Sequence, residues 1–174
     1  MDRQTHRYVS FDVLIEARKY MEKTLIAEGR PAEILLVDDN RGDALLASHA
    51  FKEAKVASNL TVASTGEIAL AILNQDGEYA GKRLPDLIML DLGLPKMSGV
   101  EVLTQIKTDK RLQHIPVIVM SNSGAGHNIL KSYQLYANAY VVKPVDLNKF
   151  REAIGLIEKF FFMLACVPAQ EMDA

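Results

Sequence analysis

Short apolar runs alternate with amphipathic segments along most of this chain. Five runs have the length of buried strands, and we expect strands at residues 34–37, 60–63, 87–90, 116–120 and 139–142. The segments between them repeat apolar residues at helical spacing and predict helices at residues 41–55, 67–74, 100–108, 128–136 and 147–164. Strands that alternate with helices require right-handed crossovers, which predicts an α/β fold whose parallel sheet has helices on both faces. In the first of these helices, the expected core residues include Leu45, Leu46 and Phe51.

Another helical pattern precedes this alternation. From Ser10 onward apolar residues form two neighbouring stripes, and Gly29 and Pro31 follow as helix-ending residues. We therefore expect an extension with one amphipathic helix at residues 1–31, one domain at 32–168 and a tail at 169–174. The helix must bury its apolar surface on its own domain, on a second copy or on a partner. Met21 is an alternative to Met1 as the natural start of translation, in which case the first 20 residues would not belong to the natural protein.

Composition and charge describe an ordinary globular protein. Of 174 residues, 49% are hydrophobic and 24% are charged, and the formal net charge of −2 gives no overall attraction to nucleic acid or membranes. Cys166 is the only cysteine, which excludes an intramolecular disulfide and fits a reducing cytoplasm. The longest apolar run, at residues 160–167, is too short to span a bilayer, and the N-terminus has no signal-peptide pattern. We expect a cytoplasmic protein.

Acidic side chains follow two of the predicted strands. Asp91 comes directly after the apolar run at residues 87–90, and Asp38 and Asp39 come after the first strand. Open α/β sheets bind their ligands at the carboxyl ends of the strands, so these acids converge at one edge if the two strands are neighbours. Two alternatives remain open: Asp91 is a solvated loop residue, and Asp38 and Asp39 only stabilise the next helix through its dipole.

Carboxylates that converge in this way must hold a proton or bind a cation. Two unit charges ~4 Å apart repel by roughly 4 kcal/mol at an effective dielectric constant of about 20. A few hard oxygen ligands with room for water suit Mg²⁺, with Mn²⁺ as an alternative. A carboxylate beside Mg²⁺ can also act as a nucleophile toward phosphorus.

Two later strands end in residues that bind anions. Ser121 closes the fourth strand, and Lys143 and Pro144 close the fifth. A hydroxyl and an ammonium at the same sheet edge can bind the oxygens of a phosphoryl group carried by Asp91. Each residue is ordinary when taken alone, but their joint occurrence with the acids of the first and third strands is a specific pattern.

With this pattern, residues 33–164 resemble the receiver domain of two-component response regulators. The resemblance implies a flavodoxin-like, doubly wound, five-stranded parallel sheet of order 2-1-3-4-5, to which the N-terminal helix is an addition. It also implies that a histidine kinase transfers a phosphoryl group to Asp91 and that the receiver catalyses its own Mg²⁺-dependent phosphorylation and dephosphorylation.

The resemblance assigns roles to individual positions. It implies a metal site made of Asp39 as a direct ligand, Asp38 through water, Asp91, and the backbone carbonyl of Gly93. It further implies that Lys143 binds the phosphoryl group, that Ser121 is the switch hydroxyl and that Tyr140 is the aromatic switch residue. The Lys143–Pro144 peptide bond is expected to be cis. A half-buried packing residue is the alternative interpretation of Tyr140.

Details at residues 75–84, 94–96 and 158–162 resemble single-domain regulators that accompany phytochrome-type histidine kinases. The expected partner is therefore a histidine kinase, with a bacteriophytochrome as one candidate. The signal is expected to pass through changed protein–protein contacts at the fourth helix, fifth strand and fifth helix. Asn122 departs from the family pattern, where many receivers have Ala or Gly, and its bulk is expected to narrow access for small phosphoryl donors.

The apolar segment 160–167 is either a dimer contact or the buried end of the last helix, and we favour a homodimer through it. No nucleic-acid or membrane partner is expected, since the chain has no basic face or helix-turn-helix pattern. The alternative function is a receiver-like adaptor or scaffold that works without phosphorylation. An aspartyl-nucleophile phosphatase needs a second acid where Gly93 stands, and a nucleotide-binding enzyme needs more than the lone G-x-G at residues 124–126.

Overall fold

The computed structural model describes residues 30–53, 57–122, 124 and 126–164. The expected amphipathic helix of the extension, the choice between Met1 and Met21, and the tail at residues 169–174 lie outside these ranges. In the described ranges, no helix is long and apolar enough to cross a bilayer.

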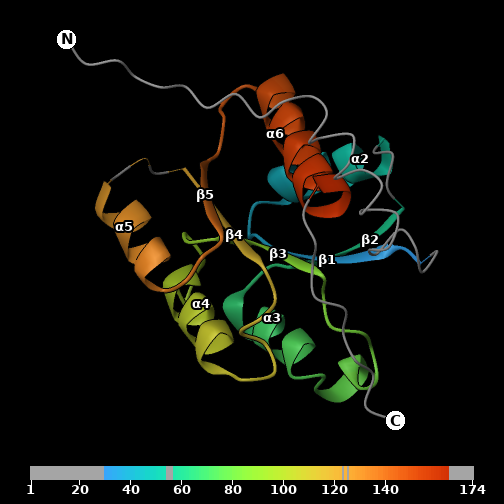
Figure 1. The fold of residues 1–174 in the computed structure, drawn as a ribbon, viewed down its shortest axis with the longest axis vertical. Coiled ribbons are helices and arrows are strands. Elements are labelled where there is room, and N and C mark those ends of the chain that lie inside the picture. Colours follow the sequence, from blue (N-terminus) through green and yellow to red (C-terminus); the bar gives the residue numbers. More distant parts are fainter. Residues whose placement is uncertain (1–29, 54–56, 123, 125, 165–174) are drawn as a thin grey trace.

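A five-stranded sheet forms the centre of the molecule (Figure 1). The strands are β1 (Ala32–Val37), β2 (Ser58–Ala63), β3 (Leu87–Asp91), β4 (Val117–Ser121) and β5 (Ala139–Val142). All neighbouring pairs are parallel and their order is β2-β1-β3-β4-β5, which confirms the predicted sheet. The central strands β3 and β4 are buried along their whole length, whereas the edge strands β2 and β5 are partly exposed.

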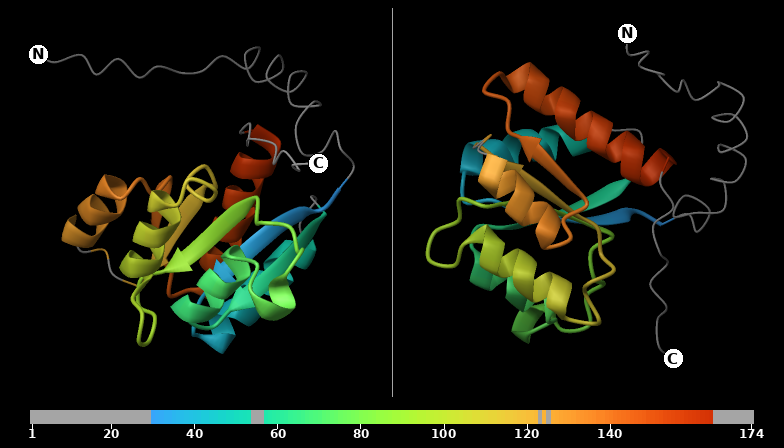
Figure 2. Two further views of the ribbon diagram at one scale, coloured as in Figure 1. Left: turned by 90° about the horizontal axis from the view of Figure 1, so that it is seen from below. Right: turned by 60° about the vertical axis from the view of Figure 1, so that its left-hand side comes forward.

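Helices cover both faces of this sheet. Their bounds are α2 (Arg41–Glu53), α3 (Gly66–Leu73), α4 (Gly99–Thr108), α5 (Gly126–Gln134) and α6 (Leu147–Lys159), with a short 3-10 turn at Gly77–Tyr79 and a π turn at Phe160–Leu164. Figure 2 shows α2 and α6 side by side on one face, and α3, α4 and α5 on the other. Side chains of a strand alternate between the faces, so Leu35 and Val37 enter the core under α3 and α4, while Ile34 and Leu36 enter the core under α2 and α6.

One predicted core residue is wrong. Leu45 is 60% exposed, while Phe51 is 4% exposed and Leu46 is half-buried. A helix that covers a sheet buries only one stripe, and in α2 this stripe contains Ala47 and Phe51, four residues apart. Leu45 lies on the side of the helix that faces away from the sheet.

The apolar segment after α6 is partly a core element. Phe161 and Phe162 are 8% and 4% exposed and pack with Ala32 and Ile154 between α6 and the sheet, whereas Phe160 is 54% exposed. Part of the segment is therefore the buried end of the last helical element. The homodimer stays a prediction, and replacing Phe161 and Phe162 would damage the core before it tested a dimer contact.

Two further features lie at the ends of strands. The Arg30 guanidinium forms a double hydrogen bond with the buried carboxylate of Asp86, at 2.9 Å for both contacts, and this ties the start of the described chain to the amino end of β3. At the opposite edge, the expected cis bond between Lys143 and Pro144 is wrong, because none of the peptide bonds in the described ranges is cis. The trans form is favoured by about 0.5–1 kcal/mol even before proline.

Candidate functional site

Three carboxylates meet where β1 and β3 end. Asp38, Asp39 and Asp91 each place one oxygen within 4.8 Å of the others. The register of the two neighbouring strands brings this about, because Val37 pairs with Leu90 and the next residue of each strand is an acid. Asp38 and Asp91 are buried and Asp39 is exposed, so one side of the cluster faces solvent.

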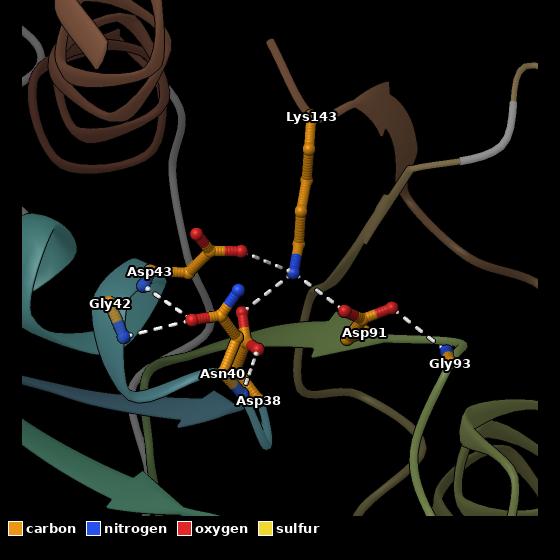
Figure 3. A network of polar contacts seen from close by, with 7 residues as sticks. All are labelled: Asp38, Asn40, Gly42, Asp43, Asp91, Gly93 and Lys143. Carbon is orange, nitrogen blue, oxygen red and sulfur yellow. Dashed lines mark hydrogen bonds and ion pairs between the residues drawn. The ribbon is translucent and has the colours of Figure 1, made fainter. Parts of the chain in front are cut away.

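Lys143 follows the edge strand β5 and reaches this cluster across the end of β4. Its Nζ donates to Asp91 Oδ2 at 2.5 Å, to Asp38 Oδ2 at 2.8 Å and to Asp43 Oδ2 at 3.0 Å (Figure 3). β4 separates β5 from β3, a distance of about 10 Å at the usual strand spacing. The long lysine side chain spans much of this gap, which a short side chain at the same position cannot do.

Burial and charge act on these groups in opposite directions. Burial by itself lowers the pKa of Lys143. Three hydrogen bonds, to Asp38, Asp91 and Asp43, together with the negative charge of Asp38, outweigh burial and raise this pKa above its ordinary value. Lys143 is therefore an ammonium at any physiological pH. Burial raises the pKa of Asp38 above its ordinary value, although hydrogen bonds from Lys143 and from the Asn40 backbone N–H oppose this. Among the described residues, Asp38, Asp43 and Asp91 contact the Lys143 ammonium and Asp39 lies beside them, so acidic groups outnumber basic groups at the site.

The donor set fits a hard divalent cation. The three clustered side chains offer carboxylate oxygens, which are the ligands that Mg²⁺ and Mn²⁺ prefer. Asp91 Oδ1 accepts a hydrogen bond from the Gly93 N–H at 2.8 Å, so the loop after β3 is folded back against the carboxylate. The surplus of acidic over basic groups at the site supplies the attraction that such a cation needs.

A cavity of about 710 Å³ opens over the cluster, and most of the predicted site residues line it. Its lining is polar around the carboxylates and consists of Asp39, Asn40, Asp91, Leu92, Gly93, Val100, Ser121, Asn122, Asn128 and Lys143. Asp38 does not line the cavity; it is buried, lies against Asp39 and Asp91, and accepts a hydrogen bond from Lys143 Nζ. The structure therefore brings together the predicted acids, the lysine and the serine.

The two expected switch residues lie differently. Ser121 is the last residue of β4, is buried, and accepts a hydrogen bond from the Lys143 N–H at its backbone oxygen, so it stands directly beside the lysine. Tyr140 is half-buried and packs against the core under α3 and α4. It does not line the cavity, and its packing fits both interpretations given to it.

Asn40, Asp43 and Asn128 also lie at the site and were not among the predicted residues. Asn40 Oδ1 accepts hydrogen bonds from the N–H groups of Gly42 and Asp43 and so caps α2. The signal for a helix start was present, since Asn is a preferred N-cap residue and acids such as Asp43 are common in the first turn of a helix. Nothing local indicated that Asp43 contacts a lysine 100 residues later in the chain. Asn128, in the first turn of α5, has no such signal.

Comparisons with known proteins agree with this geometry. The sequence profile of the family "Response regulator receiver domain" matches residues 34–155. Response regulator Rcp1 of Synechocystis sp. is 37% identical over 139 residues, which cover 80% of this chain and 95% of that protein.

Solved structures with the same fold include two regulators of this kind. The phosphorylated cyanobacterial phytochrome response regulator RcpA has a TM-score of 0.78 and 39% identity, over 80% of this chain and all of that one (100%). The Mn²⁺-bound form of response regulator Rcp1 has a TM-score of 0.77 and 37% identity over the same shares, 80% and 100%.

Proposed function

This chain belongs to the response regulator receiver domain family, and we propose that it accepts a phosphoryl group from a histidine kinase on Asp91. The observation that carries the proposal is the contact of Lys143 Nζ with Asp91 Oδ2, beside two further acids and beneath an open cavity. An acid, a cation-binding cluster and an ammonium in one place are what phosphoryl transfer to a carboxylate requires.

In the proposed reaction, a carboxylate oxygen of Asp91 attacks the phosphorus of a phosphohistidine. The new P–O bond forms as the P–N bond breaks, and the bonding pair leaves with the imidazole of the kinase. Lys143 and the hydroxyl of Ser121 bind the oxygens of the transferred group, since both line the cavity that holds Asp91.

Asp38, Asp39, Asp91 and the Gly93 carbonyl are the residues proposed to hold Mg²⁺. Bound there, the cation would offset the negative charge of the transferring phosphoryl group. Mn²⁺ is an alternative, and the Mn²⁺-bound form of Rcp1 supports a divalent cation at this kind of site.

We further propose a phytochrome-type histidine kinase as the partner, which the likeness to the phytochrome response regulator RcpA supports. Phosphorylation then favours a conformation in which Ser121 moves toward the phosphoryl group and Tyr140 turns inward. The signal passes through contacts at α5, β5 and α6, where Leu130, Val142 and Leu156 are among the exposed apolar residues. In the proposed homodimer, Phe160 is the exposed apolar residue at the start of the C-terminal segment.

The test is phosphoryl uptake from a phytochrome-type histidine kinase that carries a labelled phosphohistidine, in the presence of Mg²⁺. The wild-type chain should take up a base-labile phosphoryl group, and Asp91→Asn should take up none. Asp76→Asn makes the same chemical change at an exposed turn residue and should behave as wild type.

Unchanged uptake by Asp91→Asn would remove this residue from the role. A wild-type chain that neither takes up phosphate nor responds to beryllofluoride, a mimic of the phosphoryl group, would favour the phosphorylation-independent adaptor.

A further inference from the structure

A fourth carboxylate, that of Asp43, lies at the site. Its Oδ2 is 3.0 Å from Lys143 Nζ, and its side chain is 24% exposed. Figure 3 shows the carboxylate of Asp43 on the opposite side of the ammonium from Asp91. It comes from the first turn of α2, whereas the other acids that contact Lys143 follow β1 and end β3.

The start of α2 directs this side chain. Asn40 caps the helix, and Asp43 is the third residue after it. A Glu or Gln at this position often turns back and accepts a hydrogen bond from the N–H of the cap residue. Here the Asn40 N–H donates to Asp38 Oδ1 at 2.9 Å instead. The carboxylate of Asp43 is directed at Lys143.

Lys143 uses its whole donor capacity on these acids. An ammonium has three N–H donors, and Lys143 Nζ contacts three carboxylates: Asp38, Asp43 and Asp91. Asp38 and Asp91 are also members of the group whose oxygens converge within 4.8 Å, but Asp43 is not. In the part of the chain that the structure describes, Asp43 is therefore the one acid that contacts Lys143 and stands apart from the candidate cation site.

We propose that Asp43 is a positioning residue that keeps Lys143 in place when a divalent cation engages Asp38 and Asp91. The inference rests on the proposed function, which places a cation at the carboxylates that also hold the lysine. Without Asp43, the ammonium depends wholly on the two acids that the cation needs, and the two positive charges compete for them. With Asp43, the ammonium keeps a carboxylate partner that the cation does not use, and it therefore stays close to Asp91.

A double-mutant cycle on the full chain tests this role through Mn²⁺ affinity, measured from the free Mn²⁺ signal in electron paramagnetic resonance. The four proteins are the wild type, Asp43→Asn, Lys143→Met and the double variant. We expect Asp43→Asn to weaken Mn²⁺ binding about fivefold when Lys143 is present, and by less than about twofold when it is Met. Competition by the lysine is the reason for the difference.

An effect of Asp43 through its charge alone would weaken Mn²⁺ binding by the same factor in both backgrounds, and this result would overturn the proposal. Asn has the shape of Asp, and the cap of α2 comes from Asn40, so the variant should fold; circular dichroism checks this. Asp43→Ser is the second variant if it does not.

Failure of this inference and failure of the proposed function are distinguishable, because Mn²⁺ binding does not require phosphoryl transfer. If Asp43→Asn weakens Mn²⁺ binding only when Lys143 is present, but the wild-type chain takes up no phosphate, the role of Asp43 is supported and the proposed function is contradicted. A wild-type chain that binds no Mn²⁺ would contradict both.

Discussion

Gly99 packs directly against the backbone of Asp91. A Cβ atom at position 99 would lie 2.0 Å from the carbonyl oxygen of Asp91 and 2.7 Å from the Cα of Leu92. Gly99 is the first residue of α4, and Ser98 caps this helix through a capping box with Glu101. The absence of a side chain at position 99 therefore lets α4 begin immediately beside the proposed phosphoryl-accepting residue.

Gly99→Ala should destabilise the protein by about 3 kcal/mol, because the overlap is with backbone atoms that cannot rotate away. The measurement is urea unfolding. Gly155→Ala is the matched control: Gly155 lies in α6, a Cβ atom there would meet no atom within 4 Å, and alanine should stabilise the helix by about 0.5–1 kcal/mol. Equal effects of the two substitutions would contradict the steric argument.

Mg²⁺ should stabilise the folded chain, because the cation relieves repulsion among acids that converge only in the native state. At a concentration of about 100 times its dissociation constant, a ligand of the native state adds about 2.7 kcal/mol to the free energy of unfolding. Asp39→Asn should lose most of this gain at little cost to the fold, since Asp39 is exposed. Thermal unfolding with and without Mg²⁺ measures both, and an undiminished gain in the variant would argue against the site.

Lys107 should make stability depend on pH in the alkaline range. Its Nζ donates to the backbone oxygens of Ile115 at 2.7 Å and Gln113 at 3.1 Å, and burial lowers its pKa from 10.5 to about 8. Between these two values the unfolded chain binds more protons than the folded chain, so the free energy of unfolding rises with pH. The neutral amine retains two N–H donors, enough for both carbonyls.

The measurement for Lys107 is urea unfolding of the wild type and of Lys107→Met across this pH range. The wild type should gain stability relative to the variant as the pH rises from about 8 toward 10.5. A difference between the two proteins that stays constant over the range would contradict the prediction.

Asn122→Ala should speed phosphorylation by small donors such as acetyl phosphate several-fold. The Asn122 side chain follows β4 and lines the cavity together with Asp91, so its removal widens the approach to the carboxylate. Transfer from a kinase should change less, because docking of the kinase positions its phosphohistidine. Asn148→Ala, at an exposed position of α6 away from the cavity, is the control. Equal rates for wild type and Asn122→Ala would show that this side chain does not restrict access.

Asp91 and Asp43 differ in how far the sequence determines their contacts. Asp91 follows an apolar run, and the carboxyl ends of parallel strands meet at one edge of a sheet, so its place beside Asp38 and Asp39 was predictable. The contact of Asp43 with Lys143 depends on the rotation of α2 about its axis and on the reach of a lysine across β4. No local pattern encodes these quantities.

The same limit accounts for Leu45 and Phe162. Both are large apolar residues at helical spacing, yet Leu45 is exposed while Phe162 is buried between α6 and the sheet. Periodicity places residues on a common side of a helix, but which side meets the sheet is decided by packing against the other elements.

By itself, the sequence determined the alternation of strands and helices, the parallel sheet and the strand ends at which Asp38, Asp39, Asp91, Ser121 and Lys143 stand. These follow from periodicity, which is local, and from the connectivity rules of parallel sheets. Only the tertiary structure decided the partners of Lys143, the close approach of Gly99 to Asp91 and the burial of Phe161 and Phe162. These are contacts between segments distant in sequence, and their geometry arises when the elements pack together.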